Sequence, residues 1–178
     1  MGIFKTLGTI IGGPIVGRLT GTIMDHTPTG SITNSLIDNV FKDKVLPVEG
    51  SIVHCSLYGV EHTGVYVGNG KIAELLGTGE IRLINPKGFI NGTNAISIYI
   101  ACDNKKPIGS KTIANRAISH IGKQRDYHIL YDNCHQFASG CITGQFSDGK
   151  TLFWMLEKTI SKHLNNGRSI TWRVWDID

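Results

Sequence analysis

Apolar and polar residues alternate over short stretches in the middle of the chain, a pattern typical of half-buried β-strands. The predicted strands span residues 51–56, 62–67, 71–75, 81–84 and 95–101. The alternation is clearest in the last of these, where Ile96, Ile98 and Ile100 alternate with Ser97 and Tyr99. A similar run over residues 171–176 predicts an edge strand near the C-terminus. The sequence therefore predicts a sheet drawn mainly from the centre of the chain.

Helical periodicity occurs on both sides of this central region. Residues 31–41 place apolar side chains three and four positions apart and predict a short amphipathic helix. Ser110 is a candidate N-cap for a second helix, which follows Pro107. Two more helices are predicted, one from Asp132 or Asn133 to about Cys141 and one over residues 151–163. Because the strands cluster between the helices and do not alternate with them, we expect an α+β fold.

The first 24 residues differ in composition from the rest of the chain. They combine aliphatic residues with glycines, of which Gly13, Gly17 and Gly21 recur at four-residue spacing. In an apolar helix this spacing permits close helix contacts in membranes, but Pro14 and Arg18 leave no run of about 20 apolar residues. Two interpretations stay open, a surface arm and a segment that contacts a membrane. We divide the chain into a glycine-rich arm, residues 1–30, and a single domain, residues 31–178.

Composition and charge narrow the classes of function. A chain of 178 residues with 40% apolar residues can build a core without disulfides or metals. The net charge of +4 is too small and too dispersed to indicate nucleic-acid binding. The four cysteines lack the spacing of a zinc site, and we expect neither a metal nor a cofactor. No complete secretory signal is present, so we expect reduced thiols and a cytoplasmic protein, with membrane association through residues 1–24 left open.

Cys134 is the candidate nucleophile. It follows Asn133, a good helix N-cap residue, and it begins an apolar-periodic segment. A thiol in the first turn of a helix faces the positive end of the helix dipole and unpaired backbone donors, which lowers its pKa and favours the thiolate. The alternative is that Cys134 is a small buried apolar residue. We interpret Cys55, Cys102 and Cys141 as core thiols because they fall in strands or deeper in the helix.

His62 is the best placed of the seven histidines to act as the base for Cys134. It begins a predicted strand, and strands hold side chains rigidly. The alternative is a solvated histidine at a strand edge. His135 directly follows the candidate nucleophile, and adjacent side chains of a helix diverge by about 100°, so we expect it to be a poor base.

Glu74 is the candidate third member, and its position depends on the register of a predicted hairpin at Asn69 and Gly70. With a strict two-residue turn, Val65 pairs with Glu74, and the carboxylate lies on the opposite face from His62. With a three-residue loop and a bulge, Gly64 pairs with Glu74, which then lies diagonal to His62 on the same face. A catalytic role for Glu74 therefore requires the bulged alternative.

Two blocks of sequence resemble a known family. Residues 46–53 (LPVEGSIV) and 62–70 (HTGVYVGNG) are similar to the PGDLI and HWxIYVGxG block of lecithin retinol acyltransferase-like proteins. Residues 133–137 (NCHQF) are similar to the NCEHF block of the same family. The resemblance covers roughly residues 46–141. It implies a circularly permuted papain-like fold of the NlpC type, with an antiparallel sheet, packed helices and the nucleophile at a helix N-terminus.

Carried over to this chain, the resemblance implies that Cys134 is the nucleophile and His62 its base. The family pattern has a second histidine where this chain has Glu74, and a carboxylate can also orient an imidazole. His135 and Gln136 stand where the family has glutamate and histidine, so the chain departs from the family pattern at the two positions after the nucleophile.

The chemistry implied is acyl transfer through a thioester, on a lipid or other acyl substrate, by a hydrolase or acyltransferase. Two alternatives stay open: a peptidase or amidase acting on peptidoglycan or protein, and an inactive binding or membrane-adaptor protein. The backbone N–H of Cys134 is a candidate oxyanion donor. Tyr127 or Tyr131 could supply a second donor, and Trp154 and Trp175 could line an apolar acyl site, although ordinary packing explains all four.

Overall fold

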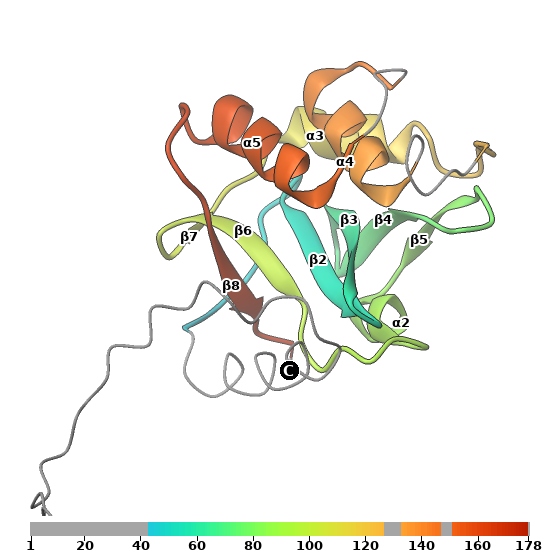
Figure 1. Ribbon diagram of the computed structural model, residues 1–178, viewed down its shortest axis with the longest axis horizontal. Helices are drawn as coiled ribbons and strands as arrows, with labels where there is room; N and C mark the ends of the chain where they lie inside the picture. Colours follow the sequence, from blue (N-terminus) through green and yellow to red (C-terminus); the bar gives the residue numbers. More distant parts are fainter. Residues whose placement is uncertain (1–42, 127–132, 147–150, 178) are drawn as a thin grey trace, which may run out of the picture.

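The computed structural model describes residues 43–126, 133–146 and 151–177, and these form a mixed α+β structure around one sheet (Figure 1). Its eight strands are β1 (Lys44–Val45), β2 (Ile52–Leu57), β3 (Val60–Gly68), β4 (Lys71–Leu75), β5 (Ile81–Ile84), β6 (Tyr99–Asp103), β7 (Lys106–Pro107) and β8 (Thr171–Trp175). The strand order is β1-β8-β6-β2-β3-β4-β5, and β7 pairs with β6. All the pairs are antiparallel except that of β1 with β8, which is parallel.

Four helices accompany the sheet in the described ranges: α2 (Pro86–Ile90), α3 (Lys111–Ile118), α4 (Cys134–Thr143) and α5 (Phe153–Leu164). Figure 1 shows α3, α4 and α5 gathered over one face of the sheet, with α2 away from them. Ser110 caps α3 by accepting a hydrogen bond from the Thr112 backbone N–H, as the sequence predicted. Asn133 caps α4, and Gly144 ends it in the left-handed conformation, with a φ of 85°.

The sheet separates two hydrophobic cores. The core beneath α3, α4 and α5 includes Phe137 and Ala138 of α4, packed against Val65 of β3 and Ala73 of β4. The second core lies on the other face and is formed by Val53, Cys55, Ile72, Phe89, Ile98, Ile100, Cys102 and Trp175. Successive side chains of a strand point to opposite faces, so each central strand contributes to both cores. This arrangement gives both faces of β3 and β4 rigid support.

The hairpin between β3 and β4 has the bulged register. Gly64 pairs with Glu74 and Tyr66 with Ile72, but Gly68 pairs with Lys71, so Val67 is the extra residue. The turn itself is two residues long, and Asn69 and Gly70 adopt φ values of 51° and 64°. The bulge therefore lies at the end of β3, before the turn, and not inside a three-residue loop. The register required for Glu74 to share a face with His62 is confirmed.

Some predictions about the secondary-structure elements were wrong in their bounds, their position in the sheet or their pairing direction. Strand β6 begins at Tyr99, four residues later than predicted, and β8 lies between β1 and β6, so it is not an edge strand. The parallel pairing of β1 with β8 corrects the expectation of a wholly antiparallel sheet. Helix α2 was not predicted. The helix predicted over residues 31–41 lies outside the described residues.

No helix in the described part of the chain is long and apolar enough to cross a membrane. The glycine-rich arm, residues 1–30, lies outside the described residues, so its proposed contact with a membrane stays a prediction.

Candidate active site

The thiol of Cys134 lies at the first position of α4, buried against the start of β3. Asn133 fixes this helix end, because its side-chain oxygen accepts a hydrogen bond of 3.0 Å from the Gln136 backbone N–H. The Asn133 amide nitrogen donates to the backbone oxygen of Thr151, at 3.1 Å. The Cys134 Sγ lies 3.9 Å from the backbone oxygen of Glu61 on β3. These contacts bring the thiol from the helical layer to the residues at the start of β3, a central strand of the sheet.

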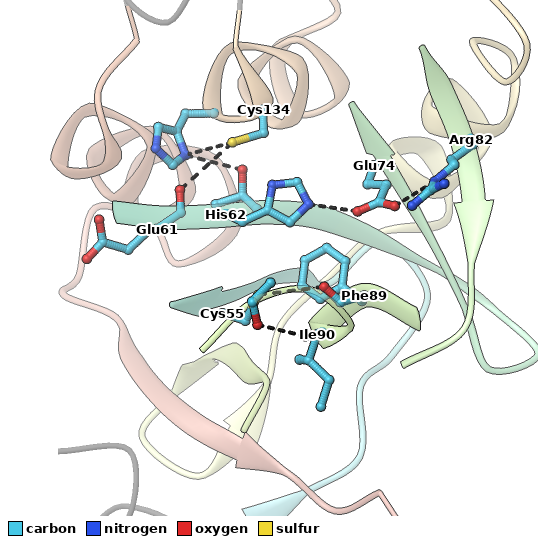
Figure 2. Close-up of polar contacts among 11 residues, drawn as sticks. Cys55, Glu61, His62, Glu74, Arg82, Phe89, Ile90 and Cys134 are labelled. Carbon is cyan, nitrogen blue, oxygen red and sulfur yellow. Dashed lines mark hydrogen bonds and ion pairs between the residues drawn. The ribbon is translucent and has the colours of Figure 1, made fainter. Parts of the chain in front are cut away.

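His62 and Glu74 form a close pair next to the thiol. The distance between His62 Nε2 and Glu74 Oε2 is 2.7 Å, and the Glu74 side chain is only 3% exposed. The other carboxylate oxygen of Glu74 accepts a hydrogen bond of 2.9 Å from Arg82 Nε on β5. Figure 2 shows the His62 ring between the Cys134 sulfur and the Glu74 carboxylate. Because Nε2 faces Glu74, the second ring nitrogen, Nδ1, is the one left for the thiol.

Phe89 supports the His62 ring from the second core. The two rings are stacked, with centroids 4.8 Å apart and planes inclined by 29°. Phe89 belongs to α2, whose start is set by the Asn85 side chain, which accepts a hydrogen bond of 2.7 Å from the Gly88 backbone N–H. Gly64, the neighbour of His62 on the same face of β3, leaves the space that Phe89 occupies. The stacked Phe89 ring therefore fixes the plane of the imidazole, and the contact between Nε2 and Glu74 fixes its rotation within that plane.

The electrostatics of the site favour an imidazolium beside a thiolate. Burial raises the pKa of Cys134, but hydrogen bonds with His135 and His62 and the charges of both outweigh it, so the thiol pKa lies well below its usual range. Burial lowers the pKa of His62, but contacts with Cys134 and Glu74 outweigh it and raise the pKa to about 9. Both shifts favour a proton on His62 and a thiolate on Cys134.

His135 is closer to the thiol than the sequence predicted. Its Nδ1 lies 3.8 Å from Cys134 Sγ and 3.2 Å from the Thr63 hydroxyl. The expectation that adjacent helical side chains diverge was therefore wrong at this position. In the first turn of α4, the His135 imidazole turns back toward the sulfur of the preceding residue, and Thr63 of β3 contacts it there.

The other three cysteines have free thiols and lie in the cores. Burial raises the pKa of Cys55 and of Cys141 to about 12, and that of Cys102 to about 11. Cys55 lies directly across from His62 in the β2–β3 pair, but its sulfur points toward the Phe89 backbone oxygen, at 3.9 Å. Cys134 is thus the cysteine whose surroundings stabilise a thiolate.

The predicted aromatic residues do not gather at this site. Trp175 is buried in the second core, with its ring packed edge-on against Tyr66. Trp154 is half exposed and lines a shallow pocket of about 350 Å³ between α4 and α5. Tyr127 and Tyr131, the candidates for a second oxyanion donor, lie outside the described residues.

Three residues of the site were not found from the sequence: Thr63, Arg82 and Phe89. Arg82 pairs directly with Glu74 in the β4–β5 register, so opposite charges on consecutive predicted strands were the available signal. Asn85 followed by Pro86 is a helix-start signal that could have located α2 and its buried Phe89. Thr63 carries no such signal, because its contact depends on where α4 packs.

The fold and the site define an α+β protein in which a buried thiol at a helix N-terminus meets an imidazole from the sheet. Comparison with families identifies one that matches more than half of the chain: the model for lecithin retinol acyltransferase covers residues 46–147. The chain belongs to the lecithin retinol acyltransferase family. Membership suggests acyltransferase or hydrolase activity. No curated protein matched the chain.

Proposed function

We propose that the protein is a cysteine-dependent acyl hydrolase or acyltransferase that works through a thioester on Cys134. His62 is the acid and base of this reaction, and Glu74 orients it. The observation that carries the proposal is the line of side chains from the thiol through the imidazole to a buried carboxylate, with 2.7 Å between His62 and Glu74. The membership of the chain in an acyltransferase family supports the same chemistry.

In the first half of the reaction, the Cys134 thiolate attacks the carbonyl carbon of the acyl group. A carbon–sulfur bond forms, and the bond to the leaving group breaks as His62 gives its proton to the leaving oxygen or nitrogen. The negative charge on the carbonyl oxygen needs donors during this step. The Cys134 backbone N–H supplies one, since it belongs to the first turn of α4, where backbone donors have no partner within the helix.

In the second half, neutral His62 takes a proton from the acceptor. The acceptor is water in a hydrolase and an alcohol or amine in an acyltransferase, and its oxygen or nitrogen attacks the thioester carbon. The carbon–sulfur bond breaks, and its electron pair returns to the sulfur. The thiolate and imidazolium are restored together, which matches the charge state that the surroundings of both residues favour.

The same residues support a permuted papain-like arrangement of the NlpC type. The histidine precedes the cysteine in the sequence, and the cysteine begins a helix that packs on a sheet carrying the histidine. This order is the one expected when the two halves of a papain-like domain are exchanged along the chain.

Labelling with a thiol-reactive acyl probe tests the role of Cys134. We expect the wild type and the Cys141→Ala variant to form an adduct and the Cys134→Ala variant to form none. Cys141 is a matched control, because it belongs to the same helix and is buried in the core. Equal labelling of the two variants would exclude Cys134 as the nucleophile.

A substrate panel then separates the classes of function. The protein is incubated with phospholipids, acyl thioesters and muropeptides, and mass spectrometry locates any adduct on Cys134. An acyl adduct from a phospholipid or acyl thioester supports the proposal. An adduct formed only from muropeptides indicates an amidase or peptidase, and the absence of any adduct, together with an ordinary thiol pKa, indicates a binding or adaptor protein.

A further inference from the structure

The thiol of Cys134 lies between two imidazoles, and the proposed reaction uses only one of them. His62 approaches from β3, and Figure 2 shows it on the side of the thiol that faces Glu74. His135 approaches from α4, with its Nδ1 3.8 Å from Cys134 Sγ. A contact of this length is within the range of a hydrogen bond to sulfur, whose atomic radius exceeds that of oxygen.

The position of His135 is set by elements other than its own helix. The hydroxyl of Thr63, on β3, lies 3.2 Å from the same Nδ1, and Thr63 is fully buried. Phe153, at the start of α5, packs against the ring with centroids 5.6 Å apart and planes inclined by 57°. A proton on Nδ1 can be shared between the sulfur and the hydroxyl oxygen, both of which accept hydrogen bonds. The ring is therefore held by β3 and α5, in addition to its own helix, in a position that faces the thiol.

His62 does not interact with the thiol alone. Arg82 and His62 contact the two oxygens of the buried Glu74 carboxylate, so His62 is shared between Glu74 and Cys134. Among the described residues, the side chains that act directly on the thiol are His62 from β3 and His135 from α4. Glu61 of β3 contacts the sulfur through its backbone oxygen, Glu74 of β4 contacts His62, and Cys55 of β2 lies near the thiol. Burial keeps Cys55 protonated, because its pKa is raised to about 12. His135 is thus the group besides His62 whose ring nitrogen lies in position to donate a hydrogen bond to the sulfur.

We propose that His135 is a second catalytic partner of the Cys134 thiolate and that Thr63 is the positioning residue that holds it there. In the resting protein, His135 stabilises the thiolate while His62 is also bound to Glu74. In the release half of the reaction, the carbon–sulfur bond breaks and its electron pair moves to the sulfur, beside His135 Nδ1. His135 stabilises this departing thiolate while His62 receives the proton of the acceptor. The role in release rests on the proposed function, whereas the stabilisation of the resting thiolate does not.

The test is the pH dependence of alkylation of Cys134 by iodoacetamide, with the site of the adduct located by mass spectrometry. We expect His135→Gln to raise the apparent pKa of the thiol by about one unit, which lowers the alkylation rate about tenfold below that pKa. Thr63→Val removes the hydroxyl with little change of volume and should shift the titration in the same direction by a smaller amount. His163→Gln is the matched control, because His163 lies exposed near the end of α5, and its titration should overlay that of the wild type.

A titration of His135→Gln that overlays the wild type, in a variant with an unchanged melting curve, would overturn the proposal. If His135→Gln does not fold, the Thr63→Val variant provides the test. An unchanged titration of Cys134 in that variant overturns the proposed role of His135 and Thr63. Alkylation needs no acyl substrate, so failure of the proposed function would give a different result: an intact difference between the titrations, but no acyl adduct on Cys134 of the wild type.

Discussion

The His62 imidazole lies against the Phe89 ring because Gly64 has no side chain. A Cβ on Gly64 would lie 2.5 Å from Ile72 Cγ2 and 3.1 Å from Phe89 Cε2, closer than packed atoms tolerate. We expect Gly64→Ala to cost about 1–3 kcal/mol of the free energy of unfolding, as overpacked cores do. It should also lower kcat/KM, because Phe89 must move from beneath the imidazole. Urea unfolding and the acyl-transfer assay measure the two effects.

Gly77→Ala is the control for this substitution. Gly77 lies in an exposed turn, and a Cβ there would meet no atom within 4 Å. We expect stability and activity close to those of the wild type. If Gly64→Ala behaved like Gly77→Ala in both assays, Phe89 would not be the support of the imidazole.

Replacing Glu74 by glutamine tests the carboxylate. The side chain keeps its size, but it no longer carries the charge that helps to hold the pKa of His62 at about 9. His62 should then lose its proton at a lower pH, and we expect kcat/KM at neutral pH to fall by roughly 10²- to 10⁴-fold. Glu80→Gln, an exposed position just before β5, is the control. Steady-state kinetics and an NMR titration of the His62 ring provide the measurements, and an unchanged His62 titration would contradict the assignment.

Arg82→Met tests the partner on the other side of the carboxylate. Arg82 Nε is 2.9 Å from Glu74 Oε1. The Arg82 side chain is 41% exposed, so solvent weakens the electrostatic attraction of the pair. The hydrogen bond from Arg82 to the buried Glu74 carboxylate remains. We expect a loss of about 1–2 kcal/mol of the free energy of unfolding. The loss should be smaller when Glu74 is already glutamine, and a double-mutant cycle measures this difference. Equal losses in both backgrounds would show that Arg82 does not act through Glu74.

The pH dependence of kcat/KM should be bell-shaped with a wide plateau. The pKa of His62 is raised to about 9, so the imidazolium is lost only as the pH rises through that value, and activity falls there. The pKa of Cys134 is lowered, so activity falls at low pH only where the thiolate takes up a proton, well below the usual thiol range. The two limbs belong to the coupled pair. A rise in activity near pH 8.5, as for an ordinary thiol, would contradict the ion pair.

The register of the β3–β4 hairpin shows which part of the site could be predicted from the sequence. The residues Asn69 and Gly70 identified the turn, and the requirement that His62 and Glu74 share a face identified which of two registers would bring them together. The sequence could not choose between them, because the same turn residues fit both. The extra residue, Val67, is accommodated beside Gly68, which has a φ of 94° and faces the Glu49 side chain, and this contact is tertiary.

The errors at the ends of elements have a similar cause. Alternation of Ile96, Ile98 and Ile100 predicted a strand from residue 95, but β6 pairs with β2 only at Tyr99 and Ile100, and Ile96 is half exposed. Alternation of apolar and polar residues indicates which side chains point to the buried face of a sheet. A strand begins only where a neighbouring strand is present to form backbone hydrogen bonds with it. The contact of His135 with the thiol was missed for a related reason, since Thr63 comes from another element.

The two cores on either side of the sheet have a consequence for cooperativity. Phe137 and Ala138 anchor the helix that carries Cys134 in one core, and Phe89 holds His62 from the other. Partial unfolding that released either face of the sheet would separate the thiol from the imidazole while much of the remaining structure stayed intact. The reactivity of Cys134 therefore reports on the integrity of both halves at once, and a fall in its alkylation rate should precede the loss of secondary structure during gradual denaturation.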